Sequence, residues 1–471
     1  MSRLVTVSNR VALPKPSSAP GGLAVGVLAA LRASGGLWFG WNGETDAPER
    51  LEPDITVRDG ITFATITLPQ SLHELSYSGF ANGTLWPLFH YFLDGFRYQD
   101  EEHEAYQEVN ELFARQLLPL LRPDDLIWVH DYHLIPLAEK LRAKGVSSRL
   151  GFFLHIPFPH FEVLRALPVC NELMRALLTY DVIGFQTETD RQAFLGAVRM
   201  IGGNSRVTAN GSILSEGRVV VTDVFPIGID VDAVARSAAR AAESAPVRRM
   251  QQGLLARRLI IGVDRLDYSK GLLERFEAYR HFLEACPEHL GNVTYLQIAP
   301  LGRQNVKAYA RIRDSLEQSA GRTNGRFADT DWTPIRYLNR NFPHATLMGF
   351  MRAANVCLVT PVRDGMNLVA KEFVAAQDPN NPGVLILSDR TGAACELTEA
   401  LLVNPYDTRA IARAIQHALD MSLPERQRRH AALLSALRKH DIHMWRSRFL
   451  KALAGSPSHV SGRYGTDLSV A

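Results

Sequence analysis

Short apolar runs recur along the chain and alternate with longer stretches of helical periodicity. Runs of four to eight residues rich in Val, Ile and Phe, separated by helix-sized segments, predict buried strands of parallel β-α-β units. The expected strands are 4–7, 61–68, 126–129, 150–156, 182–185, 219–225, 259–263, 293–298, 356–359, 384–387 and 401–403. The expected helices are 71–75, 104–121, 134–143, 191–200, 272–285, 306–320, 370–376 and 409–421. The pattern predicts the α/β class.

The division of the chain follows from the stretch with the weakest strand signals, 230–258, which is rich in Ala and Arg. It lies between two halves of similar size, so we expect two doubly wound parallel-sheet domains with a boundary near residue 230. The segment 455–471 is rich in Gly and Ser and lacks periodicity, which predicts a disordered tail.

Composition excludes several classes of protein. Of the 471 residues, 46% are hydrophobic and 21% are charged, which excludes a chain that is disordered throughout. The net charge of +3 gives no electrostatic reason to expect nucleic acid as a partner. The first ten residues lack a signal-peptide core, and the most apolar stretch, 21–31, is too short to span a bilayer. We therefore expect a cytoplasmic enzyme with no membrane partner.

The four cysteines lie far apart in the chain without CxxC spacing: Cys170, Cys286, Cys357 and Cys395. Such spacing argues against a zinc site and against a disulfide framework. It predicts reduced thiols in the core.

Polar residues follow the apolar runs where the strands are expected to end. In open parallel sheets, ligands bind in the crevice at the carboxyl ends of the strands. A single polar strand end is ordinary, because strands commonly lead into polar loops. Six of the apolar runs, however, are followed by Arg, Lys, His or Asp, and this pattern favours a binding site between the two halves. Five cations are expected at this edge: Arg10, Arg265, Lys270, Arg303 and Arg363.

Arg265 and Lys270 suit a diphosphate, because Arg grips phosphate with two hydrogen bonds and Lys acts as a point charge. A solvated basic turn is the alternative. Gly21 and Gly22 precede an apolar helix expected at 23–31 and could bring backbone amides to an anion. A plain turn fits them equally, and neither GxGxxG nor GxxxxGK[ST] is present.

Several other side chains are candidates with a structural alternative. Asp131 could bind an acceptor, since a metal site at 130–133 lacks a third ligand. His155 could donate a hydrogen bond or be a buried structural histidine. Glu372 could bind sugar hydroxyls or complement a helix dipole. Residues 329–333 match DxDxT, yet no apolar strand precedes them, so we interpret the match as coincidence. Aromatic residues near the N-terminus suit either a sugar pocket or the core: Trp38, Trp41, Tyr77 and Trp86.

Taken together, the motifs resemble the bacterial trehalose-6-phosphate synthases from residue 1 to about 450. The matching segments are LVTVSNR at 4–10, GGL at 21–23, LWFGWNG at 37–43, LWPLFH at 85–90, WVHDYHL at 128–134, GFFLHIPFP at 151–159, GFQTE at 184–188, DRLDYSKG at 264–271, PVRDGMNLVAKE at 361–372 and NPYD at 404–407. They occur in the family's order and spacing.

The resemblance implies a GT-B fold, in which two Rossmann-like domains face each other across a cleft. The domains would be 1–229 and 230–441, with a crossover helix at about 442–454. It also implies transfer of glucose from UDP-glucose to glucose 6-phosphate with retention, giving α,α-trehalose 6-phosphate and UDP for trehalose biosynthesis and stress protection. It implies no cofactor, no metal, no nucleic-acid partner and a homotetramer.

The resemblance also implies roles for individual residues. Those that would hold glucose 6-phosphate are Arg10, Tyr77, Trp86, Asp131 and Arg303. For UDP-glucose, it implies that Gly21 and Gly22 lie on a mobile loop over the donor and that Arg265 and Lys270 hold the diphosphate. Phe342 would contact the uracil. The residues that would line the nucleotide are Leu368, Val369, Ala370, Lys371 and Glu372, with Glu372 on the ribose. Asp364 and His155 would contact the transferred glucose, and together with Arg265 and Lys270 they form the expected catalytic group.

Retaining glycosidases use a carboxylate nucleophile about 5 Å from the general acid, and the sequence offers no obvious residue of that kind. We expect front-face transfer, in which the leaving phosphate takes the acceptor's proton while Arg265 and Lys270 neutralise it. Two related enzymes remain open, one using glycerol 3-phosphate as acceptor and one using GDP- or ADP-glucose as donor. An inactive sugar-phosphate sensor would be expected to have lost the donor-site cations. A fused phosphatase domain is not expected, since little chain follows residue 450.

Overall fold

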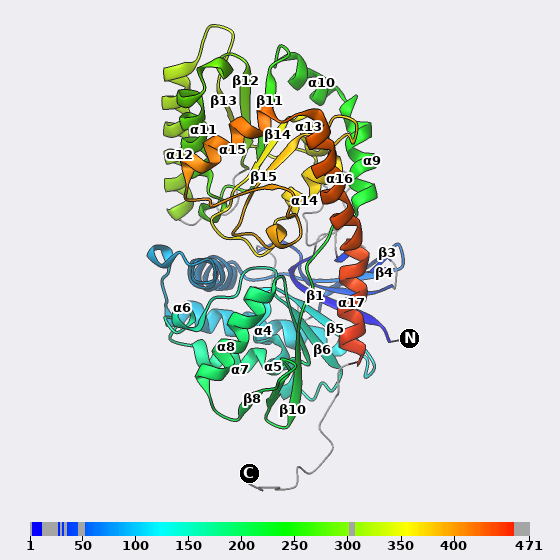
Figure 1. The fold of residues 1–471 in the computed structure, drawn as a ribbon. Coiled ribbons are helices and arrows are strands. Elements are labelled where there is room, and N and C mark those ends of the chain that lie inside the picture. The colour runs from blue at the N-terminus through cyan, green and yellow to red at the C-terminus, as the bar shows by residue number, and fades with distance from the viewer. Residues whose placement is uncertain are drawn as a thin grey trace, which may run out of the picture.

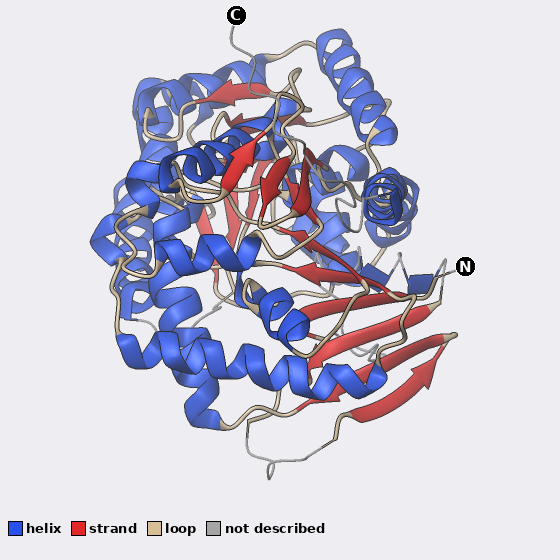
Figure 2. Ribbon diagram, turned by 90° about the horizontal axis from the view of Figure 1, so that it is seen from below, coloured by secondary structure: helices blue, strands red, loops and turns tan. Residues whose placement is uncertain are grey.

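The computed structural model describes residues 2–11, 27–28, 31–32, 35–45, 52–300 and 307–455. Three predicted site residues, Gly21, Gly22 and Arg303, lie outside these ranges, as do most of the helix expected at 23–31 and the tail after residue 455. The chain forms two α/β halves, one above the other in Figure 1. Each half contains a sheet, and helices (blue in Figure 2) lie around the strands (red).

The sheet of the first half has ten strands in the order β3-β4-β2-β1-β5-β6-β7-β10-β9-β8. From β4 to β10 in this order the neighbours pair in parallel, and β3, β8 and β9 pair antiparallel at the two edges. The strands are β1 (Leu4–Arg10), β2 (Gly36–Trp41), β3 (Asp54–Arg58), β4 (Ile61–Ile66), β5 (Leu126–His130), β6 (Arg149–Phe153), β7 (Val182–Phe185), β8 (Ser205–Val207), β9 (Ile213–Ser215) and β10 (Arg218–Val224).

The sheet of the second half has six strands in the order β13-β12-β11-β14-β15-β16, and every pair is parallel. Its strands are β11 (Arg258–Val263), β12 (Val293–Ile298), β13 (Ile335–Leu338), β14 (Val356–Val359), β15 (Val384–Ser388) and β16 (Leu401–Val403). The strand order reverses beside β1 in the first sheet and beside β11 in the second. Such switch points open a crevice at the carboxyl ends of the strands.

Helices cover both sheets. In the first half these include α2 (Gln70–His73), the π-helix η1 (Glu74–Leu85), α3 (Trp86–Phe89), α4 (Asp100–Leu117), α5 (Leu137–Ala143), α6 (Phe161–Leu164), α7 (Cys170–Leu177) and α8 (Glu188–Ile201). In the second half they include α9 (Val231–Ala242), α10 (Ala245–Gln252), the 3-10 turn η5 (Tyr268–Lys270), α11 (Leu272–Ala285), α12 (Lys307–Phe327), α13 (His344–Ala353), α14 (Leu368–Ala376), α15 (Thr408–Asp420) and α16 (Leu423–Lys439). The last helix is α17 (Ile442–Gly455).

The predicted α/β class with two mainly parallel sheets is confirmed. The strands expected at 182–185, 293–298, 356–359 and 401–403 have these bounds in the structure. The stretch 230–258, which carried the weakest strand signals, forms α9 and α10. The domain boundary expected after residue 229 falls between β10 and α9, and it stays a prediction.

The last helix returns the chain to the first half, and α17 packs on β6 and β7 (Figure 1). The Phe449 ring stacks on Trp128 with centroids 4.5 Å apart. Gly151 and Gly184 leave room for it, since a Cβ at either position would lie within 3 Å of the Phe449 ring. One apolar cluster therefore includes residues of both halves, among them Trp128, Phe449, Leu259 and Phe373.

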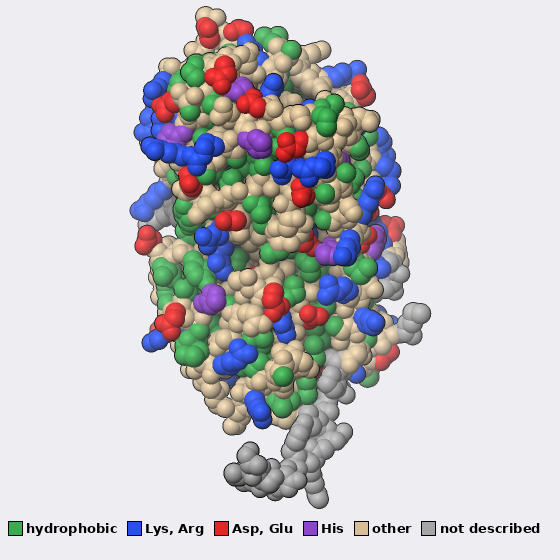
Figure 3. Space-filling view, in the orientation of Figure 1, with side chains coloured by type: hydrophobic (Ala, Val, Ile, Leu, Met, Phe, Trp, Pro, Cys, Tyr) green, Lys and Arg blue, Asp and Glu red, His purple; other side chains and the backbone are tan. Residues whose placement is uncertain are grey.

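Cations and carboxylates are interspersed on the face shown in Figure 3. Among the described helices, none combines the length and the apolar character needed to cross a membrane.

Candidate active site

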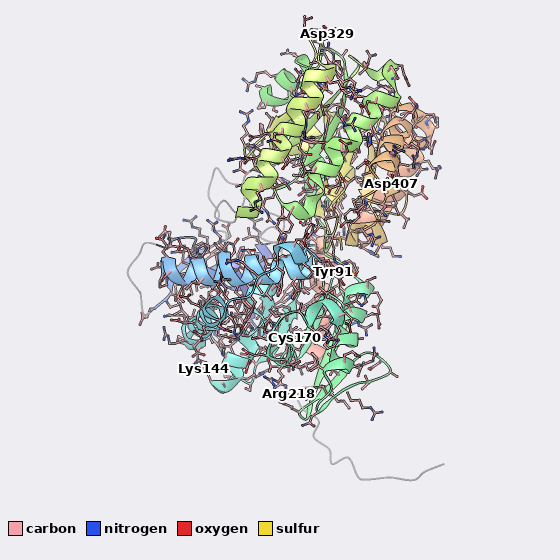
Figure 4. The ribbon with its side chains drawn as sticks, turned by 90° about the vertical axis from the view of Figure 1, so that its left-hand side faces the viewer. Tyr91, Lys144, Cys170, Arg218, Asp329 and Asp407 are labelled. Carbon is pink, nitrogen blue, oxygen red and sulfur yellow. The ribbon has the colours of Figure 1, made fainter. Side chains whose placement is uncertain are left out.

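The loops at the carboxyl ends of the two sheets touch each other. A Cβ at Gly365, which follows β14, would overlap the backbone of His155, which follows β6. The guanidinium of Arg363 lies 4.0 Å from the ring centroid of Tyr91, and Tyr91 lies where the two halves meet (Figure 4). The strand-end residues of both halves therefore line one shared region, as the sequence pattern predicts.

Arg265 follows β11 and points across this region. Its guanidinium lies 5.2 Å from the centroid of Trp86, which belongs to the first half. Its Nη2 donates to Oδ2 of Asp267 at 2.7 Å, and the Asp267 side chain is fully buried. Oδ1 of Asp267 accepts the backbone N–H of Ser269, at the start of η5. One buried carboxylate thus orients Arg265 and also the turn that carries Lys270.

Lys270 is bound to the loop after β14. Its Nζ lies 2.6 Å from Oδ2 of Asp364, and Nδ2 of Asn367 donates to the same oxygen at 3.1 Å. Burial alone would raise the pKa of Asp364, but the Lys270 ammonium opposes it and the net pKa is below the usual 3.8. Asp364 is therefore ionised at neutral pH and paired with Lys270.

The turn after Lys270 requires glycine. Gly271 has a φ of 63°, and a Cβ there would overlap the backbone of Thr360. Below the turn, the fully buried Arg275 donates to Asp264 at 2.5 Å and to the carbonyl of Lys270 at 3.1 Å. The buried Arg275 thus ties the first residue of the segment DRLDYSKG to the carbonyl of Lys270 within the same segment.

On the first half, Arg10 ends β1 and remains exposed. Its guanidinium lies 5.6 Å from the centroid of Trp41. From Trp41 a series of rings continues through His73 and Tyr77 to His133, with successive centroids 4.5, 5.0 and 5.5 Å apart. Tyr77 lies in the π-helix η1, and such helices often occur at functional sites. The stacked rings form an aromatic wall beside a cation.

Trp86 continues the aromatic lining and is mostly buried, with 7% of its surface exposed. The ring of His90 lies 4.1 Å from it, and His90 Nδ1 donates to the Trp86 carbonyl at 2.8 Å. Burial lowers the pKa of His90 to about 4, and the charges of Asp267, Lys270 and Asp364 also act on it. Sequence reasoning missed His90, although the i, i+4 spacing after Trp86 places both on one side of a helical turn.

Asp131 and His155 are neighbours. Asp131 has a φ of 74°, a conformation that non-glycine residues rarely adopt. Its Oδ1 accepts the backbone N–H of His155 at 3.2 Å. Burial lowers the pKa of His155 to about 3, so its ring is neutral at physiological pH.

Helix α14 carries five predicted nucleotide contacts, and its N-terminus follows Asn367. Leu368 and Val369 are half-buried. The side chains of Ala370 and Lys371 do not face the shared region: both are fully buried, and Lys371 Nζ binds Glu396 and the carbonyl of Ile227. Lys371 can therefore contact a nucleotide only through its backbone. Its side chain links α14 to the segment around Ile227 that connects the two halves.

The last of the five, Glu372, and the predicted uracil contact, Phe342, both lie at partly buried positions. Glu372 Oε1 lies 3.0 Å from Nε2 of His344, the first residue of α13. The hydrogen bond to Glu372 raises the pKa of His344 above 6.5, although burial opposes it. The centroid of Phe342 lies 4.5 Å from the guanidinium of Arg340 and 5.4 Å from the centroid of Phe350, which packs against it in a T-shaped arrangement. A cavity of about 510 Å³ along β13 begins at this ring.

The sequence left Trp38 open between a sugar pocket and the core, and the structure shows that it is a core residue, because it is 1% exposed and its Nε1 donates to Ser8 at 2.8 Å. One expectation was wrong. Cys395 is exposed, whereas the other three cysteines are buried as predicted.

The DxDxT match also lies away from the site. Asp329 is at the end of the second half remote from the first (Figure 4), and Asp331 is held by Arg257 at 2.6 Å. Within the described part of the chain, no group of three or more His, Cys, Asp and Glu side chains could hold a metal ion.

Three comparisons with known proteins bear on this site. A trehalose-6-phosphate synthase of Klebsiella pneumoniae is 50% identical over 467 residues, covering 98% of this chain and 96% of its own. A UDP-forming trehalose-phosphate synthase of Burkholderia xenovorans in complex with glucose 6-phosphate superposes with a TM-score of 0.93 at 49% identity, covering 96% of this chain and 100% of its own. An Escherichia coli protein bound with UDP-2-fluoro glucose superposes with a TM-score of 0.92 at 49% identity, covering 96% and 99%.

These neighbours confirm the predicted GT-B architecture. The model of glycosyltransferase family 20 matches residues 8–455. That range contains both sheets except the first four residues of β1, the strand-end loops of each and the crossover helix α17. The chain therefore belongs to glycosyltransferase family 20.

Proposed function

We propose that the chain transfers glucose from UDP-glucose to glucose 6-phosphate and releases UDP and α,α-trehalose 6-phosphate. Family membership and the bound ligands of its structural relatives support this reaction. The structural observation that carries it is the contact between Arg265 and Trp86. Arg265 is a cation at the switch point of the second sheet, and Trp86 is an aromatic residue of the first half. A donor phosphate and an acceptor sugar bound to these residues would meet at the same point.

The acceptor binds to the first half in this proposal. Arg10 holds the 6-phosphate, because its exposed guanidinium is the cation beside the aromatic wall. Tyr77 and Trp86 border the pyranose ring, as aromatic residues commonly do in sugar sites. Because Tyr77 is stacked between His73 and His133, it meets the sugar with its ring edge and hydroxyl. Asp131 accepts hydrogen bonds from sugar hydroxyls. Arg303 is included among the acceptor-binding residues only because of the resemblance to the family.

The donor binds to the second half. Arg265 and Lys270 hold the diphosphate, Asp364 and His155 contact the transferred glucose, and the first turn of α14 faces the nucleotide with Glu372 on the ribose. Phe342 contacts the uracil. Gly21 and Gly22 are included among the donor-binding residues only because of the resemblance to the family.

The chemical step we propose is a front-face substitution. The bond between the anomeric carbon and the diphosphate oxygen breaks, and the acceptor hydroxyl attacks the same face, so the configuration is retained. The acceptor's proton passes to the leaving phosphate oxygen. Lys270 and Arg265 stabilise the charge that develops on the phosphate. Asp364 is already bound to Lys270 and Asn367, so its role is to position Lys270 and the sugar rather than to form a covalent bond.

The experiment is an assay of purified protein with UDP-, GDP- and ADP-glucose against glucose 6-phosphate and glycerol 3-phosphate. We expect nucleotide release with UDP-glucose and glucose 6-phosphate, and a product with an α,α-1,1 linkage by NMR. Turnover with glycerol 3-phosphate alone would reject the acceptor. A different linkage would reject the reaction, and no turnover with any pair would favour an inactive sensor.

Two further parts of the proposal concern the protein in the cell. A cytoplasmic location is proposed, because nucleotide sugars and sugar phosphates are products of intracellular metabolism. A homotetramer is proposed from the resemblance to the family. Light scattering coupled to size-exclusion chromatography tests the assembly, and a monomer at assay concentration would reject it.

A further inference from the structure

Two histidine rings meet at the carboxyl ends of neighbouring strands. His130 is the last residue of β5, and His155 follows β6. His130 Nδ1 lies 3.1 Å from His155 Nε2, which is hydrogen-bond distance. His130 is completely buried, whereas His155 keeps part of its surface exposed.

Both rings are neutral. Burial lowers the pKa of His130 well below 6.5, and the neighbouring His155 lowers it further. Burial lowers the pKa of His155 to about 3. A neutral imidazole has one N–H donor and one bare acceptor nitrogen, so the single hydrogen bond between the rings couples their tautomers. If His130 donates from Nδ1, then Nε2 of His155 accepts this hydrogen bond and is bare. The single hydrogen of the neutral His155 ring is then on Nδ1.

The surroundings of His130 select the direction of this hydrogen bond. Among the described residues, three buried nitrogens of this cluster have no hydrogen-bond partner: His130 Nε2, Trp128 Nε1 and Trp445 Nε1. The two indole rings lie against His130, with centroids 4.6 and 6.2 Å away. Both indole nitrogens are N–H donors. A hydrogen on His130 Nε2 would add a third unpaired donor, which costs more than leaving Nε2 as an unpaired acceptor. Nε2 of His130 is therefore the bare nitrogen, and Nδ1 carries the hydrogen.

His155 is held from other sides as well. The carboxylate of Asp131 accepts its backbone N–H at 3.2 Å. The ring of Phe153 lies 4.6 Å from the His155 ring, and that of Trp445 lies 6.2 Å from it. The adjacent residues His130 and Asp131 thus hold His155 by its ring and by its backbone. With Nε2 engaged by His130, Nδ1 is the ring nitrogen that remains for a ligand.

We propose that His130 is a positioning residue that sets the tautomer of His155, so that Nδ1–H of His155 is presented to the transferred sugar as a hydrogen-bond donor. The inference rests on the proposed function, in which His155 contacts the transferred glucose. His130 touches no substrate and acts only through His155.

Two substitutions separate the hydrogen bond from packing. His130→Asn places an amide nitrogen near the position of Nδ1 and keeps a donor toward His155. His130→Phe keeps a ring among Trp128 and Trp445 and removes the donor. We expect His130→Phe to lower kcat about tenfold, the upper range for one lost hydrogen bond, with the KM for glucose 6-phosphate little changed. His130→Asn should recover most of that loss.

The decisive readout is the ¹⁵N chemical shift of the His155 ring in selectively labelled protein, assigned with His155→Phe. We expect the Nδ1–H tautomer in the wild type and the Nε2–H tautomer, or a mixture, in His130→Phe. An Nε2–H tautomer in the wild type would overturn the proposal, even if the variants fold poorly. Full kcat in His130→Phe, or no recovery in His130→Asn, would also overturn it. The tautomer is read without substrate, so failure of the proposed reaction remains a separate result.

Discussion

The ammonium of Lys270 lies 2.6 Å from the carboxylate of Asp364. Lys270 comes from the turn after β11 and Asp364 from the loop after β14, so the pair spans the switch point of the second sheet. In the proposed reaction one partner holds the donor's phosphate and the other contacts the transferred glucose. The ion pair thus connects the two groups between which the glycosidic bond breaks.

Loss of the Lys270 charge should slow the chemical step. We expect Lys270→Met, and separately Arg265→Met, to lower kcat by a factor of about 100 or more, since each removes charge stabilisation from the leaving phosphate. Steady-state assays with saturating UDP-glucose measure the effect. Lys144→Met is the matched control, because Lys144 pairs with Glu111 on α4, outside the site. A near-wild-type kcat in either site variant would reject front-face transfer assisted by these cations.

Arg10 should matter only for phosphorylated acceptors. Charge-assisted hydrogen bonds are worth about 1.5–3 kcal/mol, so Arg10→Gln should raise the KM for glucose 6-phosphate about 10- to 100-fold. The KM for UDP-glucose should change little. With unphosphorylated glucose as acceptor, the variant and the wild type should be equally slow. An equal loss of activity toward both acceptors would show that Arg10 does not bind the phosphate.

The pair His344–Glu372 should make stability depend on pH. The folded pKa of His344 is above the ordinary 6.5, so the pair stabilises fully below pH 6.5 and loses this contribution as the pH rises through the folded pKa. The difference in thermal midpoint between the wild type and His344→Gln should therefore be larger near pH 6 than near pH 8.5. A difference that grows toward high pH would contradict the raised pKa.

Lys371 should contribute to stability through its side chain. Lys371→Met leaves the buried Glu396 carboxylate without its ammonium partner, and breaking a buried pair in this way costs about 3–5 kcal/mol. The double variant Lys371→Met/Glu396→Leu should regain part of the loss. Urea unfolding measures both, and Lys144→Met, which breaks a partly exposed pair, should cost less than about 1 kcal/mol. Stability of Lys371→Met equal to that of this control would show that the buried pair is not needed.

Gly228 should be intolerant of any side chain. It lies where the two connections between the halves cross, and a Cβ there would overlap the backbone of His440 and Asp441. Gly228→Ala should therefore lower the thermal midpoint. Gly196→Ala, in the middle of α8 with nothing within 4 Å of the added atom, should be neutral or stabilising by about 0.5–1 kcal/mol. Equal midpoints for the two variants would mean that the crossing can open without cost.

Three of the four strands whose bounds the sequence predicted correctly are buried on both faces, and the fourth, Leu401–Val403, is an edge strand with an exposed Leu402. Val182–Phe185, Val293–Ile298 and Val356–Val359 contain only buried residues, so each appears as a continuous apolar run. Most of the strands that were missed lack this property, although Gly36–Trp41 is buried from Leu37 to Trp41. Asp54–Arg58 is an exposed edge strand, and in Ile335–Leu338, at the other sheet's edge, only Ile335 is buried.

The candidate site shows the same division. Arg10, Arg265 and Asp364 could be found because their side chains carry charge at strand ends. His90 and His130 were not selected, since a buried neutral histidine in a motif looks the same whether it packs, binds or positions a neighbour. Lys371 was assigned with its neighbours on α14, but its side chain is directed to Glu396, which lies 25 residues further along the chain.

The sequence by itself determined the α/β class, the two parallel sheets and the cations at their strand ends, because apolar runs and polar strand ends are local properties of the chain. Only the tertiary structure decided which of these residues meet. Arg265 reaches Trp86, Lys270 pairs with Asp364, and His130 bonds to His155 through contacts between segments 25 to 179 residues apart. Such contacts depend on strand order and on the packing of the two halves, which no local pattern encodes.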